Sequence, residues 1–345
     1  MVRSFFFLFC ALSCCILLQA QEKRFTFTRP KMGAPFTIVL YAADEARAAA
    51  LAGLAFARVD SFVSVLSDYD PGSEVNRLCA TAGTGRYVPV SPLLWQVLAE
   101  SRKAWNDSRG LFDVTAGPVT RLWRAARKAQ RLPDPDEVAA ALGRTGMEKL
   151  KLDRANQSVQ LTVSGMQLDF GGIGQGLIAG EVIRLLQDSG IASALVNATG
   201  DIVCSGPPPG KEGWSVAINL PGEADRAWSP TLVLKNGAVT TSGDVFQYLE
   251  HNGVRYGHIV DPRTGYGVTH RRNVTVRARR GTDADWLATA CSLLPLRQAR
   301  KLARKYRAGL MVAEAAPGGL KTFQNRRFRK AWRKEPAGGP PSLNN

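Results

Sequence analysis

The stretch of sequence that decides the fold is Leu168-Asp169-Phe170-Gly171-Gly172-Ile173-Gly174-Gln175-Gly176. A carboxylate ends an extended segment, and a turn with four glycines opens a helix predicted over residues 176–187. Such glycines let the backbone approach a ligand closely, and the N-terminus of a helix favours phosphate. The turn lacks the GK[ST] of a P-loop, and its GGxGxG spacing is not that of a Rossmann fingerprint. A tight connection between a strand and a helix explains the stretch equally well.

Outward from this turn, predicted strands and helices are mixed along the chain. Strand patterns occupy residues 36–41, 159–163, 194–197, 214–218, 274–277 and 310–313. Helical patterns occupy residues 44–66, 91–106, 133–143, 176–187, 283–294 and 295–307. Because the two kinds of element do not alternate strictly, we expect an α+β fold rather than a doubly wound sheet.

The first 20 residues have the pattern of a secretory signal peptide. Arg3 precedes an apolar run over residues 5–18, which is too short to span a bilayer comfortably, and Ala20 is the candidate cleavage site. A short membrane anchor and a lipid attached at Cys15 are the alternatives. We therefore expect an exported, periplasmic protein, with tethering to the membrane through its N-terminus as the second interpretation.

The rest of the chain is predicted to form one domain over residues 21–320. Residues 321–345 are first basic and then rich in Pro and Gly, so we expect a disordered tail. Once the signal peptide is removed, Cys79, Cys204 and Cys291 remain, at spacings that indicate neither a metal site nor a disulfide scaffold. At most one disulfide could form among them, and we expect buried free thiols.

The charge of the chain is strongly positive. Its 345 residues include 45 Lys or Arg and 29 Asp or Glu, a net charge of +16, and the hydrophobic fraction of 45% excludes a disordered chain. Such an excess suggests an anionic partner: nucleic acid, a phosphate-bearing ligand or a membrane surface. Residues 263–334 hold 19 basic and three acidic residues, so the whole excess lies there. The sequence has no RRM, KH, helix-turn-helix or zinc-finger pattern, and we therefore expect no nucleic-acid partner.

Polar side chains that suit metal or phosphate chemistry occur in the second half of the chain. If residues 283–294 are helical, Asp285 and Thr289 lie on one face, and their oxygens suit Mg²⁺ rather than zinc. Helix capping by Asp283 together with a solvated acid is the alternative. A turn that ends in Asp201, after the strand at 194–197, is expected to be plain turn chemistry if it stands alone.

A base for proton transfer is the other group that the sequence offers. His258, one of three histidines, lies three residues before Asp261 and follows a hydroxyl-rich segment that ends in Asp244. His258 is the best candidate for a general base, with Asp244 and Asp261 as alternatives. A lone histidine is more often structural, but its grouping with carboxylates and hydroxyls favours a site.

Taken together and in this order, these motifs resemble those of the ApbE family, the FAD:protein FMN transferases. The segment Lys31-Met32-Gly33 and residues 66–78 and 110–118 are also similar to landmarks of that family. The similarity extends from about residue 32 to about residue 294. It implies a single α+β domain, related to the T-fold, with mixed or antiparallel sheets and packed helices.

The resemblance also implies an activity and the residues that carry it. The family splits FAD at its pyrophosphate, passes FMN to a Thr or Ser hydroxyl of a target protein, and releases AMP, with Mg²⁺ as the cofactor. The backbone carbonyl of Gly172 and the side chains of Asp285 and Thr289 match the family's Mg²⁺ positions. His258 and Asp261 match its element near the reacting phosphate. The positions that match its FAD-binding residues are Met32, Tyr69, Leu111, Phe112, Asp113, Asp169 and Ile259.

One substitution separates the chain from the usual family pattern. Gln175 takes the place of a lysine, and we expect it to contact FAD without contributing a charge. Two alternatives to the transferase stay open from the sequence. One is an FAD pyrophosphatase that gives FMN and AMP, and the other is a periplasmic FAD-binding protein without catalysis. The expected partner of a transferase is an exported or membrane redox protein with an acceptor Thr or Ser.

Overall fold

The computed structural model describes residues 22–218, 231–243, 247–316 and 319–333. The predicted signal peptide, the candidate base Asp244 and the Pro/Gly-rich end of the chain lie outside these residues.

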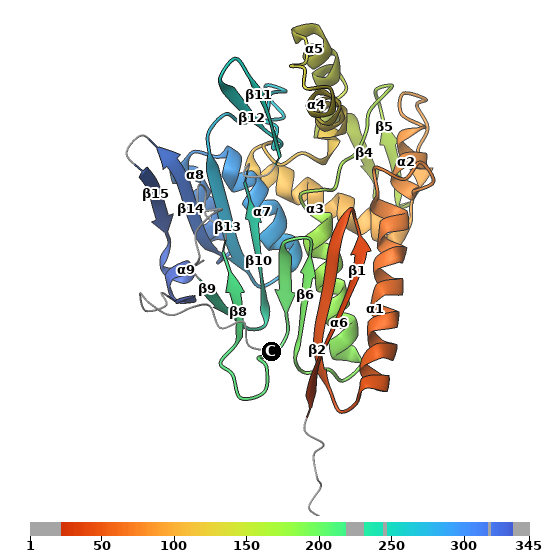
Figure 1. Ribbon diagram of the computed structural model, residues 1–345. Coiled ribbons are helices and arrows are strands. Elements are labelled where there is room, and N and C mark those ends of the chain that lie inside the picture. Colours follow the sequence, from red (N-terminus) through yellow and green to blue (C-terminus); the bar gives the residue numbers. More distant parts are fainter. Residues whose placement is uncertain (1–21, 219–230, 244–246, 317–318, 334–345) are drawn as a thin grey trace, which may run out of the picture.

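An eight-stranded sheet with antiparallel neighbours forms the centre of the domain (Figure 1). Its strands, in spatial order, are β1 (Lys23–Lys31), β2 (Ala34–Ala42), β6 (Ala194–Ala198), β7 (Asp201–Cys204), β10 (Gly237–Ser242), β13 (Arg272–Ala278), β14 (Gly309–Ala316) and β15 (Gly319–Gln324). Antiparallel pairing through the whole sheet confirms the α+β expectation.

Helices cover one face of this sheet. They are α1 (Glu45–Leu66), α6 (Gly174–Asp188), α7 (Gly281–Leu293) and α8 (Leu296–Lys305), and α3 (Pro92–Ser108) packs on α1 and α7. Alternate strand residues such as Ile38 and Val274 pack against them in the largest apolar core. The helix α1 is long and apolar enough to cross a membrane, yet Phe56 and Phe62 on it are fully buried in this core.

The opposite face of the sheet carries a second, smaller apolar cluster. Met311 and Val239 point to this side and pack with a three-stranded sheet, whose strands are β8 (Trp214–Ala217), β9 (Thr231–Leu234) and β16 (Trp332–Arg333). A short helix, α9 (Arg326–Arg329), contributes Phe328, which is fully buried.

The C-terminal boundary at residue 320 and the disordered tail from residue 321 are therefore corrected. Strand β15 continues to Gln324, and Trp332 of β16 pairs with Leu232 of β9. The physical reason is that Phe323, Phe328 and Trp332 are interspersed among the basic residues and contribute apolar side chains to the domain.

The remaining elements rise above one end of the sheet (Figure 1). They are α2 (Glu74–Cys79), α4 (Gly117–Ala129), α5 (Pro135–Gly143), the 3₁₀ turns η1 (Val114–Ala116) and η2 (Met147–Lys149), the sheet of β3 (Val88–Pro89), β4 (Leu150–Asp153) and β5 (Ser158–Leu161), and the hairpin of β11 (Tyr248–His251) and β12 (Val254–Gly257). A third apolar cluster, which includes Trp123 and Leu249, joins α4 to this hairpin. The three cysteines are buried and free, as expected, and burial raises the pKa of each thiol.

Candidate active site

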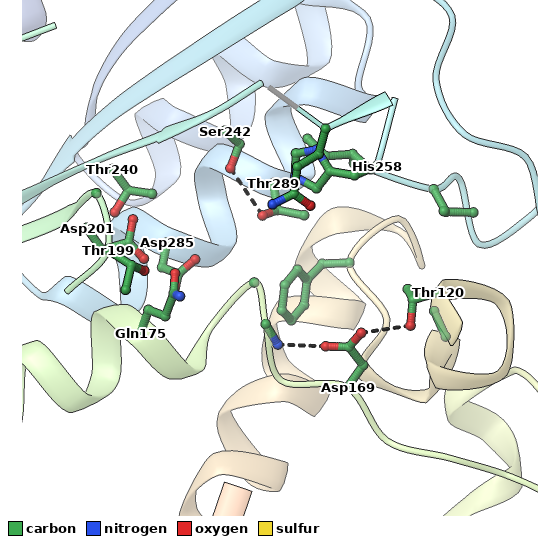
Figure 2. A pocket seen from close by; sticks show the side chains of 18 of the residues that line it. Thr120, Asp169, Gln175, Thr199, Asp201, Thr240, Ser242, His258, Asp285 and Thr289 are labelled. Atoms are coloured by element: carbon green, nitrogen blue, oxygen red, sulfur yellow. Dashed lines mark hydrogen bonds between the residues drawn. The ribbon is translucent and has the colours of Figure 1, made fainter. Parts of the chain in front are cut away.

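A cavity of about 560 Å³ brings the motifs of the sequence together (Figure 2). Its wall combines residues from the end of the sheet, from α4 and from the starts of α6 and α7. The predicted site residues in this wall are Met32, Tyr69, Leu111, Phe112, Asp113, Asp169, Gly172, Gln175, His258, Ile259, Asp285 and Thr289. A volume of this size suits a ligand as large as a nucleotide cofactor.

Two buried carboxylates lie together at one end of the cavity. Asp285 lies in the first turns of α7 and is 3% exposed, and Asp201 begins β7 and is 6% exposed. Asp285 Oδ2 accepts a hydrogen bond from the backbone N–H of Gly176 at 3.0 Å. Burial, and then the charge of Asp201, raise the pKa of Asp285 well above its ordinary value, and burial raises the pKa of Asp201 to about 6.

Close helix packing places Asp285 beside the glycine-rich turn. A Cβ on Gly176 would lie 2.3 Å from the carbonyl oxygen of Gly281 and 2.8 Å from the Cβ of Asp285. Any larger residue at position 176 would therefore push α6 and α7 apart at their N-termini. The glycine-rich turn thus serves helix packing as well as the cavity.

The atoms around the carboxylate pair suit a hard divalent cation. A Cβ on Gly172 would lie 3.0 Å from Thr289 Oγ1, so the turn and the hydroxyl one helical turn after Asp285 are adjacent. Ser242 Oγ lies 3.3 Å from the same hydroxyl oxygen. Within the part of the chain that the structure describes, neither Asp201 nor Asp285 has a salt bridge, and no group of three or more His, Cys, Asp and Glu residues gathers. An oxygen-only site with two uncompensated carboxylates fits Mg²⁺ better than zinc.

The other end of the cavity is organised around Asp169. Its Oδ1 accepts the N–H of Gly171 at 2.8 Å, and its Oδ2 accepts a bond from Thr120 Oγ1 at 2.7 Å (Figure 2). The same Oδ2 accepts a bond from Arg124 Nη2, also at 2.7 Å. Arg124 also forms an ion pair with Asp68. These bonds fix the position of the Asp169 carboxylate in the wall of the cavity.

Aromatic and apolar side chains supply the remaining wall. Tyr69 is 75% exposed, and the guanidinium carbon of Arg124 lies 4.6 Å from the centre of its ring. Phe112 is buried, and its ring centre lies 6.0 Å from that of Trp286 on α7. Rings placed in this way can stack on or pack against a planar heterocycle.

Asp113 lies in the cavity wall, but its carboxylate has structural partners. Oδ1 accepts the backbone N–H of Thr115 at 2.8 Å and the hydroxyl of the same residue at 2.5 Å, and Oδ2 accepts the N–H of Met147 at 3.2 Å. The side chain therefore caps the turn η1 and connects it to η2. Any contact of Asp113 with a ligand involves its backbone more readily than its carboxylate.

The structure separates the two described candidates for the base. His258 directly follows β12, its backbone N–H donates to the carbonyl of Gln247 at 3.0 Å, and its side chain lies in the cavity wall. Asp261 lies outside that wall, and both its oxygens accept hydrogen bonds from Arg263 at 2.6 to 3.0 Å. Burial raises the pKa of Asp261, but the bonds from the side chain and backbone of Arg263 outweigh burial and hold it below its ordinary value. The catalytic role of Asp261 stays a prediction, and in the structure its carboxylate accepts the hydrogen bonds that close the turn at Arg263.

Several residues of the cavity were not predicted as site residues. Asp201 was expected to belong to an ordinary turn, although a carboxylate three residues after a buried strand was a usable signal. The hydroxyls of Thr120 and Thr240 and the guanidinium groups of Arg124 and Arg127 also line the cavity. No helix was predicted over residues 117–129, where the structure has α4, and arginines at intervals of three residues there could have indicated both the helix and a side of it that faces a site.

Comparison with known proteins identifies the family. The sequence model of the ApbE family matches residues 32–313. A protein of Klebsiella pneumoniae (strain 342) described as FAD:protein FMN transferase is 28% identical over 339 residues, which cover 94% of this chain and 97% of that protein. A protein of Treponema pallidum (strain Nichols) with the same description is 33% identical over 256 residues, which cover 70% of each chain.

Solved structures agree with the sequence comparison. The apo form of the Pseudomonas stutzeri flavinyl transferase ApbE superposes with a TM-score of 0.80 at 29% identity, covering 90% of this chain and 98% of that one. The ApbE protein of Thermotoga maritima gives a TM-score of 0.80 at 26% identity, covering 90% of this chain and 100% of that one. The match to the family extends over most of the described domain, and the chain therefore belongs to the ApbE family.

Proposed function

We propose that this enzyme is a FAD:protein FMN transferase that requires Mg²⁺ and transfers FMN to a Thr or Ser hydroxyl of a target protein, with release of AMP. The observation that carries the proposal is the composition of one cavity. It contains the buried pair of Asp201 and Asp285, the imidazole of His258 and an aromatic wall. These are the groups that pyrophosphate cleavage, activation of a hydroxyl and flavin binding require.

The reaction balances with groups that the cavity holds. The hydroxyl oxygen of the acceptor forms a bond to the FMN phosphorus, and the bond from that phosphorus to the oxygen bridging to AMP breaks. AMP leaves with that bridging oxygen. The proton of the hydroxyl passes to His258, whose side-chain type exchanges protons near neutral pH.

Asp285, Thr289, Asp201 and the carbonyl of Gly172 are the groups that would hold Mg²⁺. When bound, the ion supplies charge neutralisation on the phosphate oxygens. Asp169, Tyr69 and Phe112 line the cavity and would orient the dinucleotide. The fixed carboxylate of Asp169 can accept hydrogen bonds from a ring or a sugar hydroxyl.

We also propose where the enzyme acts and which kind of protein it modifies. The pattern of residues 1–20 supports export to the periplasm, and an acceptor of this enzyme would then be an exported or membrane redox protein. The hydrolytic alternative differs only in the nucleophile. The observation that favours this alternative is the 75% exposure of Tyr69, because water can reach that side of the cavity.

The test incubates the chain from residue 21 onward with FAD, Mg²⁺ and a candidate acceptor protein. We expect fluorescent, covalently flavinylated acceptor in a denaturing gel, together with free AMP. Asp285→Asn should abolish both products, because it removes a charge from the proposed metal site. AMP without labelled acceptor would favour the pyrophosphatase, and bound FAD without AMP would leave only a binding protein.

A further inference from the structure

The helix α4 presents three arginines on one stripe. Arg121, Arg124 and Arg127 follow one another at intervals of three residues, which places them on the same side of the helix. Arg121 Nη2 donates to the carbonyl of Asp68 at 2.8 Å and to Asn76 Oδ1 at 3.0 Å. Arg124 is held by two carboxylates, those of Asp68 and Asp169. Two of the three guanidinium groups are thus committed to partners within the protein.

Arg127 differs from the other two. Its side chain lies in the wall of the cavity, and its Nη1 is buried without an acceptor among the described residues. Burial, and then the neighbouring charge of Arg124, lower the pKa of Arg127, but a guanidinium remains charged under all physiological conditions. A buried N–H of this kind is costly unless something accepts its hydrogen bond, and native proteins rarely keep such groups without a use.

The charges in the cavity wall make Arg127 distinctive. The wall includes five aspartates, Asp68, Asp113, Asp169, Asp201 and Asp285. Among the described residues of the wall, the side chains of Arg and Lys are those of Arg124 and Arg127. Because Arg124 is shared between two carboxylates, Arg127 is the guanidinium in this wall that has no carboxylate partner among the described residues.

The position of Arg127 along α4 indicates which part of a ligand it meets. Thr120, in the first half of the helix, contacts Asp169. Arg127 lies seven residues further along, a rise of about 10 Å, on the part of α4 that is near Tyr69. Asp201 and Asp285, by contrast, lie not on α4 but on β7 and α7. Arg127 is therefore placed for a ring of the ligand rather than for a phosphate held at the carboxylate pair.

We propose that Arg127 is a specificity-determining residue that donates hydrogen bonds to the electron-rich edge of one of the two ring systems of FAD. Carbonyl oxygens and ring nitrogens on isoalloxazine or adenine are the acceptors that fit a planar guanidinium fork. Tyr69 stacks on or beside the same ring. This inference rests on the proposed function only in taking FAD as the ligand.

Direct binding measurements test the inference without relying on turnover. The affinities of FAD, FMN and ADP are measured by calorimetry in the presence of Mg²⁺ for the wild type, Arg127→Met and Arg127→Lys. Lys128→Met is the matched control, because Lys128 is the next residue on α4 and is exposed. We expect Arg127→Met to weaken FAD binding on the order of 10-fold to 100-fold, the usual value of a charged hydrogen bond.

The smaller ligands identify the ring. An equal loss with FMN and none with ADP assigns the contact to isoalloxazine, and the reverse pattern assigns it to adenine. Arg127→Lys keeps the charge but not the fork, so it should fall between the wild type and Arg127→Met. The control should bind all three ligands like the wild type. Thermal melting of each variant shows whether it is folded. If Arg127→Met does not fold, the comparison of Arg127→Lys with the wild type provides the test.

Two results would overturn the inference. One is a folded Arg127→Met variant that binds FAD within twofold of the wild type. The other is unchanged FAD affinity together with a higher KM for the acceptor protein, which would assign Arg127 to acceptor binding. A wild type that binds FAD tightly through Arg127 but makes no flavinylated acceptor would refute the transferase proposal and leave this inference intact.

Discussion

Replacing Asp201 with Asn should stabilise the metal-free protein at neutral pH. In the wild type, two buried carboxylates share one end of the cavity, with no salt bridge to either among the described residues. The neutral amide has nearly the same shape, and its carbonyl oxygen can still accept the hydrogen bond from the Asp285 carboxyl group. The substitution therefore removes one buried charge without opening a cavity.

The magnitude follows from the pKa of Asp201. Burial raises that pKa from 3.8 to about 6, a shift of about 2 units, which corresponds to about 3 kcal/mol. The sign is fixed by proton uptake. Between pH 4 and pH 6 the folded protein holds a proton that the unfolded chain has released, so the free energy of unfolding falls as pH rises through this window. Because the amide introduced by Asp201→Asn does not titrate, the free energy of unfolding of the variant does not fall for this reason.

Chemical denaturation in EDTA at several pH values measures the difference between the two proteins. Near pH 4 Asp201→Asn and the wild type should have similar free energies of unfolding. At pH 7.5 the variant should be more stable by up to about 3 kcal/mol. Excess Mg²⁺ should stabilise the wild type more than the variant, because the ion binds the folded carboxylate pair. Equal stabilities at pH 7.5 in EDTA, or equal gains with Mg²⁺, would refute the account of this pair.

Three further predictions address other parts of the domain. Gln175→Lys should tighten FAD binding about tenfold, because it adds a charge-assisted donor for phosphate, and an unchanged dissociation constant by calorimetry would contradict this. Phe328→Ala should cost about 3–5 kcal/mol in urea unfolding, because the side chain is fully buried, and a loss below about 1 kcal/mol would mean that the C-terminal segment is not part of the core. Asp261→Asn should keep transfer within about threefold of the wild type, whereas His258→Asn should lower the rate at least about 100-fold. Equal losses in these two variants would instead support Asp261 as the base.

Much of the fold could be predicted because local patterns agree with the tertiary structure. The helix predicted over residues 91–106 corresponds to α3, whose start is capped by Ser91, since Ser91 accepts a hydrogen bond from the N–H of Leu94 at 3.2 Å. Helical spacing also placed Asp285 and Thr289 on one side of α7, where both line the cavity. Short-range chemistry of this kind is visible in a single sequence.

Long-range contacts account for what the sequence did not reveal. The turn before Asp201 resembles any turn until α7 places Asp285 beside it. Asp261 had the right neighbours for a base, and only the structure shows that Arg263 binds both its oxygens. The basic segment after residue 320 resembled a disordered tail because it contains few apolar residues. Phe328 is buried by a cluster of residues that are distant in the sequence, and this contact is visible only in the structure.

A mass balance on a single reaction mixture distinguishes transfer of FMN to an acceptor from hydrolysis of FAD. Mass spectrometry of the acceptor measures covalently attached FMN, and chromatography measures AMP in the same sample. We expect equal amounts of the two, with both lost when EDTA is present and both lost in His258→Asn. AMP in large excess over attached FMN, at saturating acceptor, would contradict a transferase and identify water as the nucleophile.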